Sequence, residues 1–255
     1  MIETIRLEYV NESHARLVLA RPERRNAMGI AELKALAEAT HKLVQRPPRV
    51  LSIVADGANF GVGGDIQAFG KALNDGTMEA WLRDAIGHFN SAIRGLRALD
   101  AAIVVGIQGA VAGGALGLVW AADHVIVADN LALNLAYARL GGSPDGGTSW
   151  FLPRLLNPLR AFELFTLTPT LDAKKALDWG LANQVVQVSH LNAAIDAVVA
   201  AWLSVPPKTL GNFKRLLRAS ADNTLSEHLQ DEMEAFVLAG RQPEFAEKVA
   251  AFLWK

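Results

Sequence analysis

The chain has 255 residues, of which 51% are hydrophobic, and its 25 basic and 26 acidic side chains give a formal net charge of −1. This length and composition can bury a large core and are typical of one soluble globular protein of enzyme size. The near-zero charge argues against a nucleic-acid or membrane-surface partner, since either needs an excess of basic side chains. The absence of cysteine excludes disulfides, thiolate metal sites and a cysteine nucleophile, and fits a reducing compartment.

The N-terminal part of the sequence predicts strands and helices in alternation. Residues 2–9 and 15–20 alternate apolar and polar side chains around residues 11–13, which is typical of a β-hairpin. Residues 30–44 carry apolar side chains at helical spacing, and residues 50–55 form an apolar strand. The first residues lack a basic segment followed by an apolar one, so we expect no signal or transit peptide and a cytoplasmic protein.

The central part continues this alternation. A glycine loop at residues 61–64 precedes a polar stretch near residues 71–76 and a helix predicted over residues 77–99. A strand at residues 102–107, a glycine turn, a helix near residues 114–122 and a strand at residues 124–128 follow. Uniformly apolar strands that alternate with helices predict an α/β fold with a mostly parallel sheet covered on both faces.

Residues 101–122 form a run of 22 uncharged residues in which Gln108 has the only polar side chain. The length of this run would allow a membrane span. Five glycines interrupt it, however, Asp100 and Asp123 flank it, and no basic cluster or aromatic belt anchors it. We therefore expect a buried strand, a glycine turn and a buried helix at the centre of the fold, with no membrane partner.

The C-terminal part is mainly helical from about residue 158, apart from a short strand at residues 185–188. Helices are predicted near residues 191–203, 208–218, 225–238 and 245–255. The sequence thus predicts an α/β core over residues 1–195 and a helical section over residues 196–255. Because this end of the chain is so apolar, we expect it to dock on another surface, such as a second subunit.

Several familiar motifs are absent from the sequence. The loop at residues 61–65 lacks the third glycine of a dinucleotide-binding fingerprint, and residues 64–70 do not have the spacing of a P-loop. The six histidines lack metal-ligand spacing, and Ser143 lies outside a GxSxG elbow. We therefore expect no metal site and no serine nucleophile.

Two glycine-rich turns remain, at residues 59–66 and 108–115, each between a buried strand and a helix. The first N–H groups of a helix have no partner within it and carry the positive end of the helix dipole. Two such groups directed at one oxygen would form an oxyanion hole, which stabilises an enolate or a tetrahedral intermediate. Alternatively, the glycines serve only tight turns and close helix packing.

Three segments resemble the signature segments of the crotonase, or enoyl-CoA hydratase/isomerase, superfamily: residues 21–28 (RPERRNAM), 60–66 (FGVGGDI) and 108–115 (QGAVAGGA). Residues 144–147 (PDGG), 150–154 (WFLPR) and 176–182 (ALDWGLA) also match, so the resemblance covers essentially the whole chain. It implies a ββα spiral core with a helical C-terminal trimerisation section, and a homotrimer or a dimer of trimers. It also implies an acyl-CoA substrate and no cofactor other than the coenzyme A of that substrate.

The resemblance also implies roles for individual residues. The backbone N–H groups of Val62 and Gly114 would hold the thioester oxygen. The residues expected to bind CoA are Arg24, Arg25, Ala27, Gly64, Asp65, Ile66, Phe236 and Lys255, with Asp65 serving mainly the local structure of its turn. The residues expected at the acyl pocket are Trp81, His88, Phe89 and Tyr137, with Tyr137 acting as a hydrogen-bond donor or only as an aromatic wall.

The reaction depends on the carboxylates. Gly117 and Tyr137 occupy the positions where a typical hydratase of the family has its two glutamates. Asp145 occupies the position used by the ring-epoxide isomerases of phenylacetyl-CoA breakdown, in which one aspartate moves a proton and can also shift a 3-enoyl double bond. A carboxylate in an apolar pocket has a raised pKa, which suits proton transfer between two carbons. The resemblance therefore favours an isomerase that acts through an enolate.

Four alternatives stay open. Asp145 could only cap the following helix, or could activate water in a hydratase or hydrolase. In the related dehalogenase branch, a nucleophilic aspartate works with a histidine at the position of Asn90, and His88 lies about 200° around the helix from that position. The last alternative is a catalytically silent acyl-CoA-binding protein.

Overall fold

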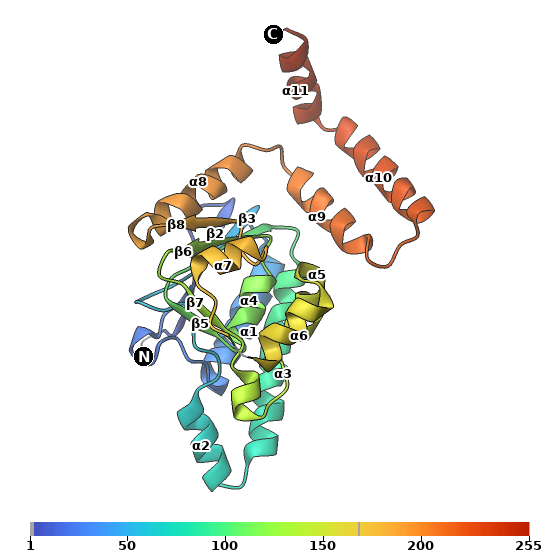
Figure 1. The fold of residues 1–255 in the computed structure, drawn as a ribbon. Coiled ribbons are helices and arrows are strands. Elements are labelled where there is room, and N and C mark those ends of the chain that lie inside the picture. The colour runs from blue at the N-terminus through green and yellow to red at the C-terminus, as the bar shows by residue number, and fades with distance from the viewer. Residues whose placement is uncertain (1–2, 168, 255) are drawn as a thin grey trace.

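The computed structural model describes residues 3–167 and 169–254. A six-stranded sheet forms its centre (Figure 1), in the order β1 (Ile5–Tyr9), β2 (His14–Leu19), β3 (Val50–Ala55), β4 (Ala102–Ile107), β6 (His124–Ala128) and β8 (Gln184–Val186). Strands β1 and β2 pair antiparallel as the predicted hairpin, and all later neighbours pair parallel. A second, two-stranded parallel sheet joins β5 (Ala110–Ala112) to β7 (Ala132–Asn134). The predicted α/β class is confirmed.

Helices cover both faces of the sheet. In chain order they are α1 (Ile30–Gln45), α2 (Ile66–Asn74), α3 (Met78–Ala98), α4 (Ala115–Trp120), α5 (Thr148–Leu155), α6 (Pro158–Thr166), α7 (Ala173–Asp178), α8 (Leu191–Leu203), α9 (Thr209–Ala219), α10 (Leu225–Gly240) and α11 (Pro243–Leu253). Alternate strand residues point to opposite faces, so Leu51 and Ile103 pack in the cluster that includes α1, α3 and α4, whereas Val50 and Val104 pack beneath α8.

The uncharged run of residues 101–122 folds into β4, a glycine turn, β5 and α4, and every residue of β4 and α4 is buried. Its lack of charge therefore reflects burial at the centre of the sheet. Among the described residues, no helix has both the length and the apolar character needed to cross a membrane.

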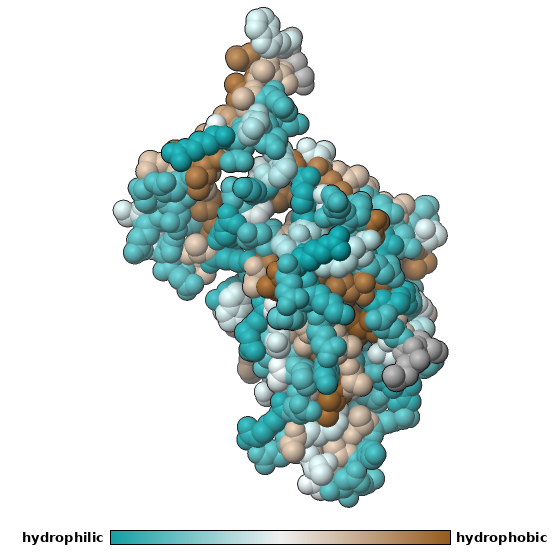
Figure 2. Space-filling view, turned by 180° about the vertical axis from the view of Figure 1, so that it is seen from behind, coloured by the Kyte–Doolittle hydropathy of each residue, from teal (hydrophilic) through white to brown (hydrophobic). Residues whose placement is uncertain are grey.

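The C-terminal helices differ in how they pack. Helix α8 lies on the sheet, where Ile195 and Val199 share one apolar cluster. The expected division between residues 195 and 196 therefore falls inside α8, and α9 is still tied to the core, where Lys214 donates to Ala101 O. Helices α10 and α11 extend away from the core as an arm (Figure 1), and brown apolar side chains are visible along it in Figure 2. Phe236, Phe252 and Trp254 are among its exposed side chains, while the trimerisation role stays a prediction.

Candidate active site

The two glycine-rich turns lie against each other at the ends of β3 and β4. The Phe60 N–H donates to Gln108 O (2.9 Å), and the Ala112 N–H donates to Gly61 O (2.9 Å). Gly63 has a φ of +83°, and a Cβ built on it would lie 2.9 Å from Ala112 O. Glycine is required there both by its backbone conformation and by this close approach. The turns are thus one unit formed by two distant segments.

A narrow, apolar cavity lies beside this unit. Its volume is about 40 Å³, and it is lined by Met28, Leu33, Gly64, Phe69, Trp81, Leu82, Ala85, Ile86, Phe89, Gly114 and Asp145. Trp81 and Phe89 line it, in agreement with the predicted acyl pocket. His88 is not among the lining residues, and its Nε2 is 3.3 Å from Asp84 Oδ1.

Asp145 is the one charged side chain of this lining. Its Oδ1 accepts a 2.6 Å hydrogen bond from the Tyr137 hydroxyl. Burial raises the pKa of Asp145 above its usual range, and the Tyr137 hydrogen bond offsets part of that rise. Burial, followed by the charge of Asp145, also raises the pKa of Tyr137. Tyr137 is therefore a hydrogen-bond donor to the carboxylate and not merely an aromatic wall.

The alternative that Asp145 only caps the next helix is wrong. Gly147 is the N-cap residue of α5, and no side chain caps this helix. The backbone carbonyl of Asp145 accepts the Thr148 N–H (3.0 Å), which leaves the carboxylate directed at the cavity. Oδ1 lies 3.2 Å from where a Cβ of Gly114 would be, so the carboxylate is adjacent to the predicted oxyanion turn.

The loop that carries Asp145 is fixed by glycines and by Phe89. Gly146 has a φ of +56°, and a Cβ built on it would lie 2.1 Å from Cε1 of Phe89. The same loop fills the space beside Gly117, where an added Cβ would lie 2.4 Å from Gly146 O. A glutamate at position 117 is therefore incompatible with this loop.

A second, wider pocket of about 390 Å³ adjoins the turns on the other side. It is lined by Glu23, Arg24, Arg25, Ala27, Val62, Gly64, Asp65, Ile66 and Gln67, so it brings together six of the eight residues expected to bind CoA. Phe236 lies on the arm and is 69% exposed, away from this pocket. Lys255 lies outside the described residues.

Asp65 organises the charges beside this pocket. Its carboxylate accepts hydrogen bonds from Arg21 (3.1 Å), from Arg24 (3.0 Å) and from the Gln67 N–H (3.0 Å), the last of which caps α2. Burial alone would raise the pKa of Asp65, but these bonds outweigh it and hold the pKa below its usual range. Arg25 is exposed, and within the described chain it forms no ion pair.

Gly64 is the residue at which the two pockets meet, since it lines both. Val62 lines only the wider pocket, and its N–H donates to Arg25 O at 3.3 Å. Within the described residues, the N–H groups of Gly64 and Gly114 have no such acceptor. The geometry therefore favours Gly64 over Val62 as the partner of Gly114. The signal in the sequence was the pair of adjacent glycines, Gly63 and Gly64. The structure shows that the first of them has a positive φ.

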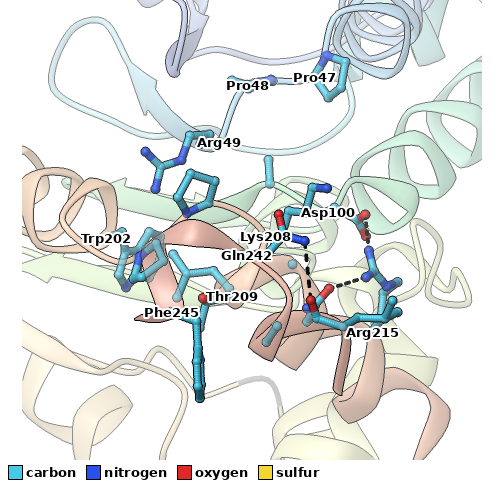
Figure 3. Close-up of a pocket in the computed structure, with 18 of the residues that line it drawn as sticks. Pro47, Pro48, Arg49, Asp100, Trp202, Lys208, Thr209, Arg215, Gln242 and Phe245 are labelled. Atoms are coloured by element: carbon cyan, nitrogen blue, oxygen red, sulfur yellow. Dashed lines mark hydrogen bonds and ion pairs between the residues drawn. The ribbon is translucent and has the colours of Figure 1, made fainter. Parts of the chain in front are cut away.

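A larger cavity lies elsewhere. It has a volume of about 620 Å³ and lies between the core and the C-terminal helices (Figure 3). Pro47, Asp100, Trp202 and Phe245 are among its lining residues, and Arg215 pairs with Asp100 at its edge. None of the predicted site residues lines it, so its size alone does not make it the candidate site.

Comparisons with known proteins agree with this geometry. The sequence model of the Enoyl-CoA hydratase/isomerase family matches residues 10–255. The 1,2-epoxyphenylacetyl-CoA isomerase of Escherichia coli (strain K12) is 31% identical over 261 residues, which cover 100% of this chain and 97% of that protein. The 4-chlorobenzoyl coenzyme A dehalogenase-2 of Arthrobacter sp is 25% identical, over 93% of this chain and 86% of that protein.

Solved structures agree as well. One is a protein of Thermobifida fusca YX in complex with acetoacetyl-CoA, provisionally described as an enoyl-CoA hydratase. It matches with a TM-score of 0.84 and 28% identity, over 92% of this chain and 94% of that one. The fold, the paired glycine turns and the match over nearly the whole sequence lead to one conclusion: the chain belongs to the enoyl-CoA hydratase/isomerase family of the crotonase superfamily.

Proposed function

We propose that this chain is an acyl-CoA isomerase in which Asp145 moves a proton between two carbons of the substrate. One observation carries the proposal. A buried carboxylate lies directly beside the Gly114 turn, while the Gly146 backbone fills the space that a hydratase glutamate would need at position 117. The site therefore offers one proton-transfer group in apolar surroundings, which suits isomerisation better than the addition of water.

The oxyanion hole is proposed to consist of the Gly64 and Gly114 N–H groups. A thioester carbonyl lies where the coenzyme ends and the acyl group begins, and Gly64 stands at the junction of the two pockets. Both N–H groups lack an acceptor within the described chain, so they are available to an oxygen that becomes negative. Donors fixed in this way contribute several kcal/mol to a transition state, at about 3–4 kcal/mol for one donor.

The reaction with a 3-enoyl thioester follows from these groups. The Asp145 carboxylate takes a proton from the α-carbon, and the electron pair of that C–H bond moves through the carbonyl onto the thioester oxygen. Gly64 and Gly114 stabilise the resulting dienolate. Protonated Asp145 then returns the proton to the γ-carbon, which forms the 2-enoyl product and restores the carboxylate. The charge balances without water or a further cofactor, and opening of a ring epoxide would use the same enolate stabilisation.

The wider pocket is proposed to hold the coenzyme. Arg25 is exposed at its rim and carries an unpaired charge, so it is the residue best placed to bind a phosphate. Arg24 is already bound to Asp65 and would contribute less. The oligomer is proposed to be a homotrimer or a dimer of trimers, which would cover the apolar arm that includes Phe236.

The test is an isomerase assay with 3-enoyl-CoA in deuterated water. Asp145→Asn should lower kcat by about 10²-fold or more, the range of general acid–base catalysis, and should abolish deuterium incorporation at the γ-carbon, where protonated Asp145 delivers a hydrogen that has exchanged with the solvent. The same variant should still bind a saturated acyl-CoA. Full isomerase activity of Asp145→Asn would overturn the assignment.

Hydration or hydrolysis is a second candidate, because Asp145 could activate water in place of a carbon acid. Incubation in ¹⁸O-labelled water distinguishes these reactions from isomerisation, since hydration and hydrolysis incorporate solvent oxygen into the product and isomerisation does not. Dehalogenation is a weaker candidate, because Asn90 stands at the position of the base in that branch and His88 is paired with Asp84. Tight binding without any solvent exchange would indicate a silent acyl-CoA-binding protein.

A further inference from the structure

Phe69 of α2 lies over the junction of the two pockets. Its Cζ is 2.7 Å from where a Cβ of Gly64 would be, and its ring lines the narrow cavity. The ring also meets that of Trp81 edge-on, with centroids 5.0 Å apart and planes at 77°. Phe69 and Trp81 thus form one aromatic wall of this cavity.

The cavity bounded by this wall is small. One water molecule needs roughly 10–15 Å³ of such space, so about 40 Å³ holds roughly three small groups. An acyl chain of about four carbons, counting the thioester carbonyl held at Gly64, would therefore fit. A longer chain or a ring would require a wall residue to move.

The residue of this wall that can move is Phe69, because it lies on α2. Ala72 is the only buried residue of this helix, and a Cβ built on Gly70 would meet nothing within 4 Å. Phe89 of α3, by contrast, is 2% exposed and lies so close to Gly146 that it has no room to turn. A longer acyl group would therefore displace the side chain of Phe69.

We propose that Phe69 sets the acyl-length limit of this protein, a specificity role that rests on the acyl-CoA function proposed above. The favoured acyl group is short and apolar, because Asp145 is the only charged side chain among the described lining residues. Longer apolar acyl groups bind only by pushing the Phe69 ring off Gly64, which removes its contact with Trp81.

The experiment measures, by calorimetry, the affinity of butyryl-, hexanoyl-, octanoyl- and decanoyl-CoA. These saturated esters contain no double bond to shift, so the measurement does not depend on the reaction. In the unaltered protein the affinity should stop increasing beyond about four to six carbons. In Phe69→Ala it should continue to rise by up to about fourfold per added methylene, the ratio that corresponds to about 0.8 kcal/mol. Phe69→Trp should shorten the limit.

Two further variants keep the test decisive. Phe69→Leu serves as the test if Phe69→Ala folds poorly. It retains an apolar contact with Trp81 and should show a smaller gain in affinity for octanoyl-CoA. Leu73→Ala removes an exposed side chain of the same helix that is not among the residues lining the narrow cavity, and should leave the length dependence unchanged. Unchanged length dependence in both Phe69→Ala and Phe69→Leu would overturn the Phe69 proposal alone. Failure of every ester to bind any variant would overturn the acyl-CoA function as well.

Discussion

The Tyr137 hydroxyl donates a 2.6 Å hydrogen bond to Oδ1 of Asp145, and this bond opposes the effect of burial on the carboxylate. Burial favours the protonated acid, whereas the hydrogen bond favours the ionised base. Tyr137 thus keeps the pKa of Asp145 lower than burial alone would set it, which enlarges the fraction of Asp145 that is able to accept a proton.

Tyr137→Phe should therefore raise the pKa of Asp145 further. The acidic limb of the plot of kcat/KM against pH should move to higher pH by about one unit, since a hydrogen bond to a charged group contributes about 1.5–3 kcal/mol and one pKa unit corresponds to about 1.4 kcal/mol. Tyr9→Phe is the control, because the Tyr9 hydroxyl bonds to the backbone of Arg46 on the surface. An acidic limb that stays in place in Tyr137→Phe would contradict the effect of Tyr137 on the pKa of Asp145.

Asp145 and Asp65 should affect stability in opposite directions. The pKa of Asp145 is raised by folding, so its ionisation opposes the fold as the pH rises through the folded-state pKa. Asp145→Asn should therefore increase the free energy of unfolding at pH 7, and the gain should vanish below pH 4. Each unit of pKa shift corresponds to about 1.4 kcal/mol.

The pKa of Asp65 is lowered by folding, so its contribution to stability is present above its unfolded pKa and is lost as the pH falls through the folded-state pKa. Asp65→Asn should decrease the free energy of unfolding at pH 7 by on the order of 1–3 kcal/mol, since it weakens bonds to Arg21 and Arg24. Urea titrations of the two variants at pH 4 and pH 7 measure both effects. Changes of the same sign at pH 7 would contradict the assigned environments.

Burial of the parallel strands explains what the sequence predicted well. The bounds of β3, β4 and β6 agree with the predicted strands at residues 50–55, 102–107 and 124–128, because strands covered on both faces consist almost entirely of apolar residues. Helix α2 was missed, since it is only nine residues long, contains Gly70 and buries only one side chain, Ala72. The short strands β5 and β7 were missed because they comprise three residues each.

The sequence predicted which segments form the candidate site, but not always which atoms of these segments face its cavities. Asp145, the residue proposed to transfer the proton, follows from residue type. The proposed oxyanion donor does not, because the Val62 N–H already has the acceptor Arg25 O whereas the Gly64 N–H does not, and this difference depends on a backbone turn with a φ of +83° at Gly63.

Gly117 provides a test of why the hydratase glutamate is missing. A Cβ at this position would lie 2.4 Å from Gly146 O, and backbone cannot yield as a flexible side chain does. Gly117→Ala should therefore lower the free energy of unfolding by about 1–3 kcal/mol, as overpacking does, and should disturb the Asp145 loop. Gly117→Glu should not create hydratase activity.

Gly87→Ala is the matched control, because it lies in α3 and a Cβ built there meets nothing within 4 Å. This variant should raise the free energy of unfolding by about 0.4–1 kcal/mol. Chemical denaturation of both variants and a hydration assay of Gly117→Glu measure these outcomes. Equal stabilities of Gly117→Ala and Gly87→Ala would contradict the packing argument.

Lys214 joins the C-terminal section to the core. It lies on α9, is 6% exposed, and its Nζ donates to Ala101 O (2.7 Å) and to Asp123 Oδ2. Burial lowers the pKa of Lys214 to about 8, against the opposing attraction of Asp123. Asp123→Ala should lower the free energy of unfolding by about 3–5 kcal/mol, because it leaves a buried cation without its partner.

Lys214→Met should have a much smaller effect at pH 7, since replacing a buried charge by an apolar side chain is often nearly neutral. It should also change the pH dependence. Between about pH 8 and pH 10.5 the unfolded lysine holds a proton that the folded one has lost, so this group makes stability rise with pH over that range. Unfolding titrations should show that this rise in the free energy of unfolding disappears in Lys214→Met and persists in Lys174→Met. Lys174 is the control, because its side chain is exposed and its pKa is raised by Asp178. An identical rise in the Lys214→Met variant would show that Lys214 does not titrate in this range.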